Sequence, residues 1–126
     1  MILGTGIDII EINRIRDSYE KLGRNFVEKI LLESEIAYCL DHRDPAPQLA
    51  ARFAAKEAIS KAFGSGISDE LGWHDIEITK RESGQPEVVL HGKGLELLRK
   101  RGASHIHLTL THAREYAAAM AIVESE

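Results

Sequence analysis

The chain has 126 residues, of which 44% are hydrophobic, and its 16 lysines and arginines face 20 aspartates and glutamates. This length and composition fit a single domain over residues 1–126 with one core and little room for a second. The formal charge of -4 argues against a protein whose main task is to coat nucleic acid. The single cysteine, Cys39, cannot form an internal disulfide, so a cytoplasmic setting is the default expectation.

The first half of the chain is predicted to be one strand followed by helices. Residues 2–12 are rich in isoleucine, contain Asp8 and are too short to span a bilayer, so we expect a buried strand and no membrane anchor. Helices are expected at about residues 13–22, 25–31, 33–40 and 47–63, the third one capped by Glu33 or Ser34.

The second half is predicted to be mostly antiparallel strands. Residues 73–81 and 87–91 read as a hairpin, and one more helix should run to about residue 101. Residues 105–112 and 116–123 should then pair with each other, although the alanines of the last segment weaken that strand prediction. The predicted class is α+β, with a mostly antiparallel sheet and a long central helix.

Asp8 is the first candidate for chemistry. In a strand it shares its face with Gly4, Gly6 and Ile10, which predicts open space beside the carboxylate. A charge among isoleucines requires a partner, so a cation or a lysine is expected next to it. The alternative is an aspartate that caps a turn at the end of the strand.

The long helix has one apolar and one polar side. A turn of 100° per residue places on one stripe Ala51, Ala54, Ala55, Ala58, Ile59 and Ala62. The other side carries Arg52, Phe53, Lys56, Glu57, Ser60, Lys61 and Phe63. A polar face interrupted by aromatic residues is typical of a groove wall. Alternatively, Glu57 and Lys61 form an ordinary exposed ion pair at i and i+4.

Polar residues also alternate along residues 105–112, where one face presents His105, His107, Thr109 and Thr111. Such a row of donors suits an anionic ligand, but a solvated sheet face produces the same alternation. A zinc site made by His105, His107 and His112 is conceivable, without a cysteine partner or an established ligand spacing.

Two weaker signals lie elsewhere. The loop at Gly64 and Gly66 offers backbone amides to a phosphate, although a glycine that ends the helix explains Gly64 equally well. Residues 13–24 carry four basic and two acidic side chains, a local charge of 4 − 2 = +2 in an acidic chain. This segment fits either a docking surface for an acidic partner or a solvated amphipathic helix.

Taken in order, four segments resemble holo-[acyl-carrier-protein] synthases over the full length of the chain. They are GTGIDIIEINRI (4–15), ARFAAKEAISKAFGSG (51–66), WHDIEI (73–78) before a Gly-x-Pro turn, and HLTLTHAREYAAA (107–119). The resemblance implies transfer of 4'-phosphopantetheine from coenzyme A to a serine of apo acyl carrier protein, with release of 3',5'-ADP. It also implies a homotrimer with sites between neighbouring subunits. The acidic charge and the short apolar start lead us to expect no nucleic-acid or membrane partner.

The same resemblance assigns roles to individual residues. It implies that Mg²⁺ is held by Asp8 and Glu57, with Lys61 and His107 offsetting charge on the phosphates. The base would be Glu57 or a metal-bound water. Contacts with coenzyme A are implied for Arg52, Phe53, Lys56, Ser60, Lys61, Gly64, Gly66, Ile67, Pro86, His107, Thr109 and Thr111. Docking of the acidic carrier protein is implied for Arg14, Lys21 and Arg24.

The sequence departs from the family pattern at a few positions. Ala51 stands where a glycine is common, and Thr109 and Thr111 replace serines but keep the hydroxyl. Gln85 replaces a lysine, which removes one possible phosphate contact. The family's usual client is fatty acid synthesis, with polyketide or peptide carriers left open. The alternative of another class is a non-catalytic module that binds coenzyme A or a nucleotide without metal-dependent turnover.

Overall fold

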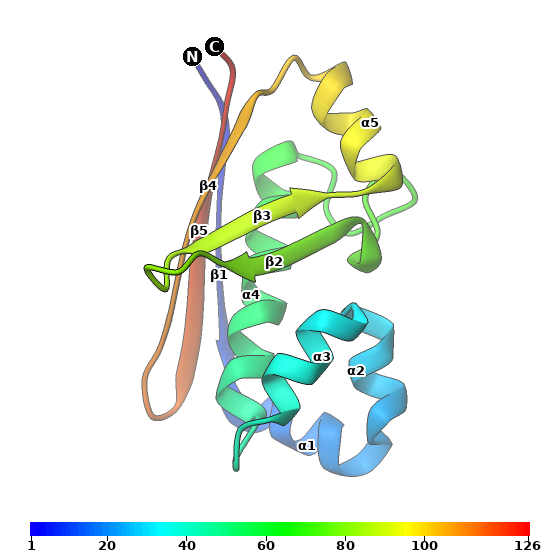
Figure 1. Cartoon of the computed structure of the whole chain (residues 1–126), viewed down its shortest axis with the longest axis vertical. Coiled ribbons are helices and arrows are strands. Elements are labelled where there is room, and N and C mark those ends of the chain that lie inside the picture. Colours follow the sequence, from blue (N-terminus) through cyan, green and yellow to red (C-terminus); the bar gives the residue numbers. More distant parts are fainter.

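The computed structural model describes residues 1–126, and Figure 1 shows helices and strands interleaved along the chain. The strands are β1 (Ile2–Glu11), β2 (Ile76–Lys80), β3 (Pro86–Leu90), β4 (His105–His112) and β5 (Tyr116–Glu124). The helices are α1 (Ile12–Leu22), α2 (Arg24–Ile30), α3 (Glu33–Leu40), α4 (Ala46–Phe63) and α5 (Gly92–Lys100). The predicted α+β class with antiparallel sheets and a long helix is confirmed. None of the helices combines the length and hydropathy that a membrane crossing requires.

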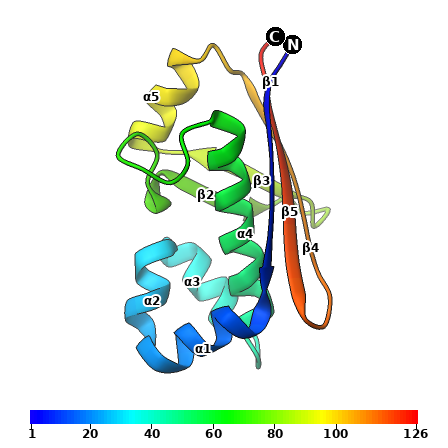
Figure 2. The ribbon, with the colours of Figure 1, turned by 180° about the vertical axis from the view of Figure 1, so that it is seen from behind.

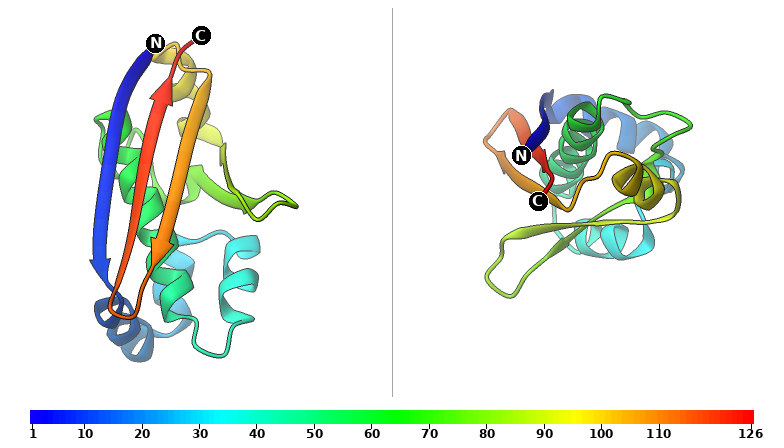
Figure 3. Two further views of the ribbon diagram at one scale, coloured as in Figure 1. Left: turned by 90° about the vertical axis from the view of Figure 1, so that its left-hand side faces the viewer. Right: turned by 90° about the horizontal axis from the view of Figure 1, so that it is seen from above.

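The main sheet has three antiparallel strands in the order β1-β5-β4, so the first and last strands of the chain are neighbours. Asp8 lies opposite Ala119, and Thr109 lies opposite Met120. Figure 3 shows the three strands side by side with α4 behind them and the two termini together at one end. The second sheet is the hairpin of β2 and β3, in which β3 lies against β4. Both β1 and β4 are therefore edge strands of the main sheet.

Two glycines allow α4 to pack directly on the backbone of β1, as the view from behind in Figure 2 shows. A Cβ atom added to Gly4 would lie 2.0 Å from the carbonyl oxygen of Ala62, and one added to Gly6 would lie 1.9 Å from that of Ala58. The predicted open space beside Asp8 was therefore wrong, because the helix fills the volume that the missing side chains leave.

Small side chains continue this close packing on the neighbouring strand. All six residues predicted for the apolar stripe of α4 are buried. They meet the inward face of β5, which is formed by Ala117, Ala119, Ala121 and Val123, all of them buried. Alanine is unfavourable in strands in general, but here it leaves room for the helix, and the predicted strand at residues 116–123 is confirmed.

The opposite face of the main sheet is not covered by any element of the chain. Its apolar residues include Ile7 and Ile9, which are 68% and 65% exposed, and Met120, which is 43% exposed. Large exposed apolar residues grouped on one sheet face are typical of an interaction surface.

Two local predictions were wrong. Trp73–Asp75 form a 3₁₀ turn before β2, because the Asp75 carboxylate accepts a hydrogen bond from the backbone N–H of Gly72 at 2.8 Å and closes the chain into a turn. The N-cap position of α3 is occupied by Leu32. Neither Glu33 nor Ser34 caps this helix, since the carboxylate of Glu35 reaches back to the Leu32 N–H at 2.8 Å.

Candidate active site

The edge of β1 and the middle of α4 bring together two carboxylates and a lysine. Asp8 points toward α4, where the Lys61 ammonium donates to its Oδ1 at 2.8 Å and to the Ile7 carbonyl at 3.0 Å. The Asp8 side chain is 16% exposed and that of Lys61 is 48% exposed. The predicted pairing of Asp8 with a cation or a lysine is thereby confirmed. The turn-capping alternative does not describe Asp8, which lies inside the strand.

Glu57 lies one helical turn before Lys61 and is partly buried. Burial raises the pKa of its carboxyl above the ordinary value, the negative charge of Asp8 raises it further, and the positive charge of Lys61 opposes both. The alternative, an exposed ion pair between Glu57 and Lys61, does not form, because the Lys61 ammonium pairs with Asp8. The site thus holds two neighbouring carboxylates, only one of which has a cationic partner.

The carboxylate oxygens of Asp8 and Glu57 fit a hard divalent cation. Carboxylate oxygens are the ligands that Mg²⁺ prefers, and it binds through one or two of them together with water and substrate phosphate. A dication would also relieve the repulsion between Asp8 and Glu57 that raises the pKa of Glu57. No three His, Cys, Asp or Glu side chains of the chain converge on one point, so the zinc alternative lacks a ligand set within one chain.

Next to Glu57, on the buried side of α4, lies an ion pair between Lys56 and Glu35. Lys56 is fully buried, and its ammonium donates to Glu35 Oε1 at 2.8 Å, to the Ile30 carbonyl at 2.8 Å and to the Trp73 carbonyl at 3.0 Å. The other oxygen of Glu35 accepts from the Ile78 N–H at 2.8 Å. Lys56 therefore uses all three protons inside the protein and joins α4 to α2, to α3 and to the 3₁₀ turn, while Glu35 extends the network to β2.

Ser60, which was also predicted to contact coenzyme A, is equally enclosed. Its side chain is buried, and its hydroxyl donates to the Glu57 carbonyl at 2.7 Å. Ser60 and Lys56 thus lie on the buried side of α4, next to Glu57 in the helix. Glu35 was missed by sequence reasoning, because nothing in its local pattern distinguishes a buried glutamate from its exposed neighbours in α3.

On the far side of α4, Arg52 lines a cavity of about 320 Å³ between α4, the β2–β3 hairpin and the end of β4. The other lining residues are Lys80, Gly84, Pro86, Leu110, Thr111 and His112. Phe53, the next residue of α4, packs against the Trp73 ring with centroids 5.2 Å apart. The expected groove wall is therefore formed by Arg52. Lys80 was missed, and His112 was considered only as a zinc ligand, since only the fold brings the hairpin and the end of β4 to the helix.

The glycine loop after α4 has left-handed backbone at two positions. Gly64 has φ 77° and Gly66 has φ 63°, and the Gly64 N–H bonds to the Lys61 carbonyl at 2.9 Å. Gly64 thus ends the helix in the manner of a glycine C-cap. The role of Gly64, Gly66 and Ile67 toward a ligand stays a prediction.

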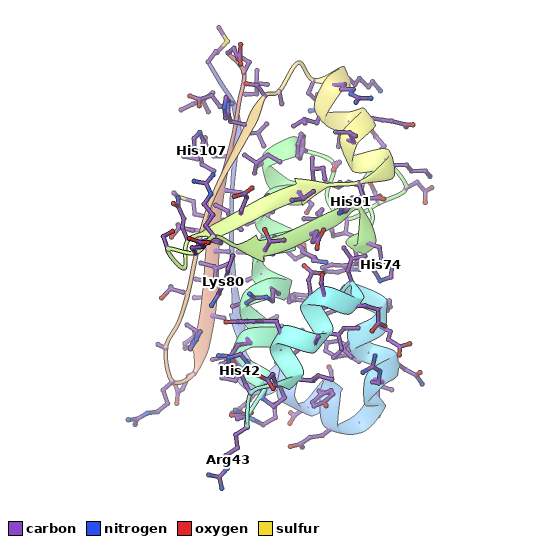
Figure 4. The ribbon with its side chains drawn as sticks, in the orientation of Figure 1. His42, Arg43, His74, Lys80, His91 and His107 are labelled. Carbon is purple, nitrogen blue, oxygen red and sulfur yellow. The ribbon has the colours of Figure 1, made fainter.

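The donors on β4 lie on the other face of the sheet. His107, Thr109 and Thr111 are exposed on the face that also carries Ile7 and Met120, whereas Asp8 faces α4. His107 bonds to the Glu124 carboxylate at 2.9 Å, and Figure 4 shows it projecting from β4. One copy of the chain therefore does not bring Asp8, Glu57 and His107 into one site.

A second cavity, of about 340 Å³, opens on the β4 side. Pro86 borders both this cavity and the one beside Arg52, so the hairpin tip stands between them. His105 and His107 line the second cavity with their rings stacked at 6.2 Å.

The basic side chains of α1 and its neighbourhood differ in their partners. Arg24 is paired with Glu28 at 3.1 Å and with Glu33 at 3.3 Å. Arg14 and Lys21 are exposed and have no carboxylate within ion-pair distance. Of the three residues predicted to dock a carrier, Arg14 and Lys21 are therefore immediately available.

Comparison with known proteins decides the family. A model described as the 4'-phosphopantetheinyl transferase superfamily matches residues 4–121. A holo-[acyl-carrier-protein] synthase of Chlorobaculum parvum is 50% identical over 119 residues, which are 94% of this chain and 96% of that protein. This chain belongs to the holo-[acyl-carrier-protein] synthase family.

Solved structures agree with this family. The holo-[acyl-carrier-protein] synthase of Neisseria meningitidis superposes with a TM-score of 0.93 at 32% identity, covering 99% of this chain and all of that one. The Bacillus anthracis synthase, solved in complex with coenzyme A (3',5'-ADP), has a TM-score of 0.84 at 37% identity and covers 100% of this chain and 99% of that one. The synthase fold thus extends over the whole chain described above.

Proposed function

We propose that this synthase transfers 4'-phosphopantetheine from coenzyme A to a serine of apo acyl carrier protein and releases 3',5'-ADP, serving fatty acid synthesis. The observation that carries the proposal is the pair of carboxylates, Asp8 and Glu57, beside Lys61. These residues match the family motifs, and a relative of the same fold was solved in complex with coenzyme A (3',5'-ADP). The cytoplasmic setting stays a prediction from the single cysteine.

The proposed chemistry follows from the charges of Asp8, Glu57 and Lys61. The carrier serine oxygen attacks the phosphorus that bears pantetheine, the bond from that phosphorus to the bridging oxygen breaks, and the electron pair leaves with 3',5'-ADP. Mg²⁺, when bound, would be held by Asp8 and Glu57 and would neutralise charge on the diphosphate. Lys61 is half-exposed and can donate to a phosphate oxygen in place of Asp8. The serine proton passes to Glu57 or to water.

We further propose that the site is completed by a neighbouring copy in a homotrimer. Within one chain Asp8 and His107 lie on opposite faces of the sheet. A site that uses both residues would need one subunit's β4 to meet another subunit's β1 edge, which supports the proposal. The uncovered apolar residues Ile7, Ile9 and Met120 supply a surface for this association. His107, Thr109 and Thr111 would then contact coenzyme A held by the neighbour's Asp8 and Glu57.

For the protein substrate, the exposed basic residues Arg14 and Lys21, with Arg24, would dock the acidic carrier. Electrostatic complementarity of this kind raises the association rate and weakens with added salt.

The test is intact-mass analysis of apo acyl carrier protein incubated with this protein and coenzyme A, with Mg²⁺ or with chelator. The expected result is a gain of one phosphopantetheine group that requires metal and is abolished by Asp8→Ala and by Glu57→Ala. Glu96→Ala, which removes an exposed carboxylate from α5, is the matched control and should remain active. Near-normal turnover of both site variants would refute the residue assignment. Binding of coenzyme A without any mass gain would favour the non-catalytic alternative.

A further inference from the structure

Two cations from different elements meet on the ring of Tyr38, a partly buried residue of α3. The Arg52 guanidinium carbon of α4 lies 4.3 Å from the ring centroid, and the Lys80 ammonium of β2 lies 4.6 Å from it. Lys80 also donates a hydrogen bond to the Tyr38 hydroxyl. The aromatic ring attracts both cations and thereby holds together two charges that repel each other.

These cations have no counter-ion within the chain. Arg52 is 4% exposed, its Nε is buried without a hydrogen-bond partner, and no carboxylate lies within ion-pair distance of its guanidinium. Lys80 likewise has no acidic partner. A buried cation is costly unless an anion or hydrogen-bond acceptors satisfy it, so this pair is incomplete as it stands.

The incomplete pair faces the cavity of about 320 Å³ that is also lined by Gly84, Pro86 and His112. Lys80 is exposed at its mouth, where Figure 4 shows it at the end of β2, and the buried Arg52 forms its inner wall. The cavity is therefore positive and open to solvent, with room for a phosphate group.

The ring itself is fixed from behind. His42 packs edge-on against Tyr38 with centroids 4.9 Å apart, and its Nδ1 lies 2.9 Å from the Tyr38 carbonyl oxygen. The α3 helix is tied to α4 by the buried pair of Glu35 and Lys56 at 2.8 Å. Tyr38 is thus supported by His42 and by the attachment of α3 to α4.

We infer that Tyr38 is a positioning residue that presents Arg52 and Lys80 to a phosphate group of coenzyme A in this cavity. The inference rests on the proposed function for the identity of the ligand. Tyr38 does not itself contact the ligand in this role, because its ring face is occupied by Arg52 and its hydroxyl by Lys80. A site whose charges are held in place before binding loses less entropy when the anion arrives.

The test uses 3',5'-ADP as a probe that needs neither carrier protein nor turnover, with its dissociation constant measured by calorimetry. Tyr38→Leu should weaken binding about tenfold, since desolvated cation–π contacts are worth roughly that factor. Tyr38→Phe keeps the ring and should stay within about threefold of the unchanged protein. Tyr19→Leu, which removes a partly buried tyrosine of α1, is the matched control and should bind normally. Thermal unfolding of each variant checks that it folds.

A second measurement separates positioning from a general structural effect. Tyr38→Leu should raise the KM for coenzyme A with little change in kcat, and its effect on 3',5'-ADP affinity should shrink when Lys80→Met is already present. Binding by Tyr38→Leu within twofold of the unchanged protein, equal losses in Tyr38→Leu and Tyr38→Phe, or no binding of 3',5'-ADP at all would each overturn the inference. Absence of transfer by the unchanged protein would instead refute the proposed function, while the calorimetric comparison would still decide the role of Tyr38.

Discussion

Lys56 shows how one residue can stand beside an active site and still belong to the core. It directly precedes Glu57, yet its ammonium is enclosed by three oxygens from α2, α3 and the 3₁₀ turn. Burial lowers the pKa of Lys56, and the charge of Glu35 opposes that shift. The main energetic consequence of this pair appears when one partner is removed, because the other charge is then left unpaired in the interior.

We predict that Lys56→Met destabilises the protein by about 3–5 kcal/mol, because the Glu35 carboxylate is left buried without its cation. Lys56→Met combined with Glu35→Gln should recover part of this loss, since no net charge remains. The measurement is urea unfolding. Lys61→Met, which removes a half-exposed lysine from the same helix, is the control and should cost less than about 1 kcal/mol. A cost for Lys56→Met as small as the control's would mean that water reaches Glu35.

At the scale of elements, the site depends on how closely β1 approaches α4. We predict that Gly6→Ala destabilises the protein by about 2–4 kcal/mol, because the new methyl group would lie 1.9 Å from the Ala58 carbonyl oxygen. Relief of this clash separates the strand from the helix, so the contact between Asp8 and Lys61 and the transfer rate should also be lost. Thermal unfolding and the mass assay measure the two effects. Glu96→Ala, at an exposed position of α5 away from this packing, should change neither. A Gly6→Ala variant as mild as this control would contradict this account of the packing.

Features with a local period were predictable from the sequence. The alanine stripe of α4 and the alternation of β4 follow from 3.6-residue and two-residue repeats, and the need of Asp8 for a partner follows from its apolar surroundings. Lys61 as that partner was not predictable, because 53 residues separate the two. The burial of Lys56 was missed for the same reason, since α4 is covered by the sheet on one side and by α2, α3 and the hairpin on the other.

The 3₁₀ turn and the Tyr38 cluster were missed because their decisive contacts join distant segments. Asp75 closes its turn through a side-chain hydrogen bond that propensity does not reveal. Tyr38, Arg52 and Lys80 come from three elements, and only the position of the hairpin beside α4 brings them together. Family motifs indicated Arg52, but no local signal indicated the ring that holds it.

At the scale of the whole molecule, the proposed site residues lie on two different faces of the main sheet. Asp8 and Glu57 lie on the α4 side of β1, whereas His107 projects from the uncovered face of β4. The proposed site would therefore use Asp8 and Glu57 of one copy and His107 of another. A variant that lacks Asp8 and a variant that lacks His107 would therefore be defective in different halves of the site.

We predict that coexpression of Asp8→Ala with His107→Ala restores transfer although each variant alone is nearly inactive. Random assortment in a cyclic assembly leaves about a quarter of the sites with both halves intact, so activity should reach about a quarter of the unchanged protein's. The mass assay measures this recovery, and light scattering on the same sample reports the assembly. Ile7→Glu in both chains places charge on the uncovered face, so it should dissociate the assembly and abolish the recovery. Leu22→Glu, at a 53% exposed leucine of α1, should leave the assembly unchanged. If the site lay within one chain, mixed assemblies would contain no intact site, and coexpression would restore nothing.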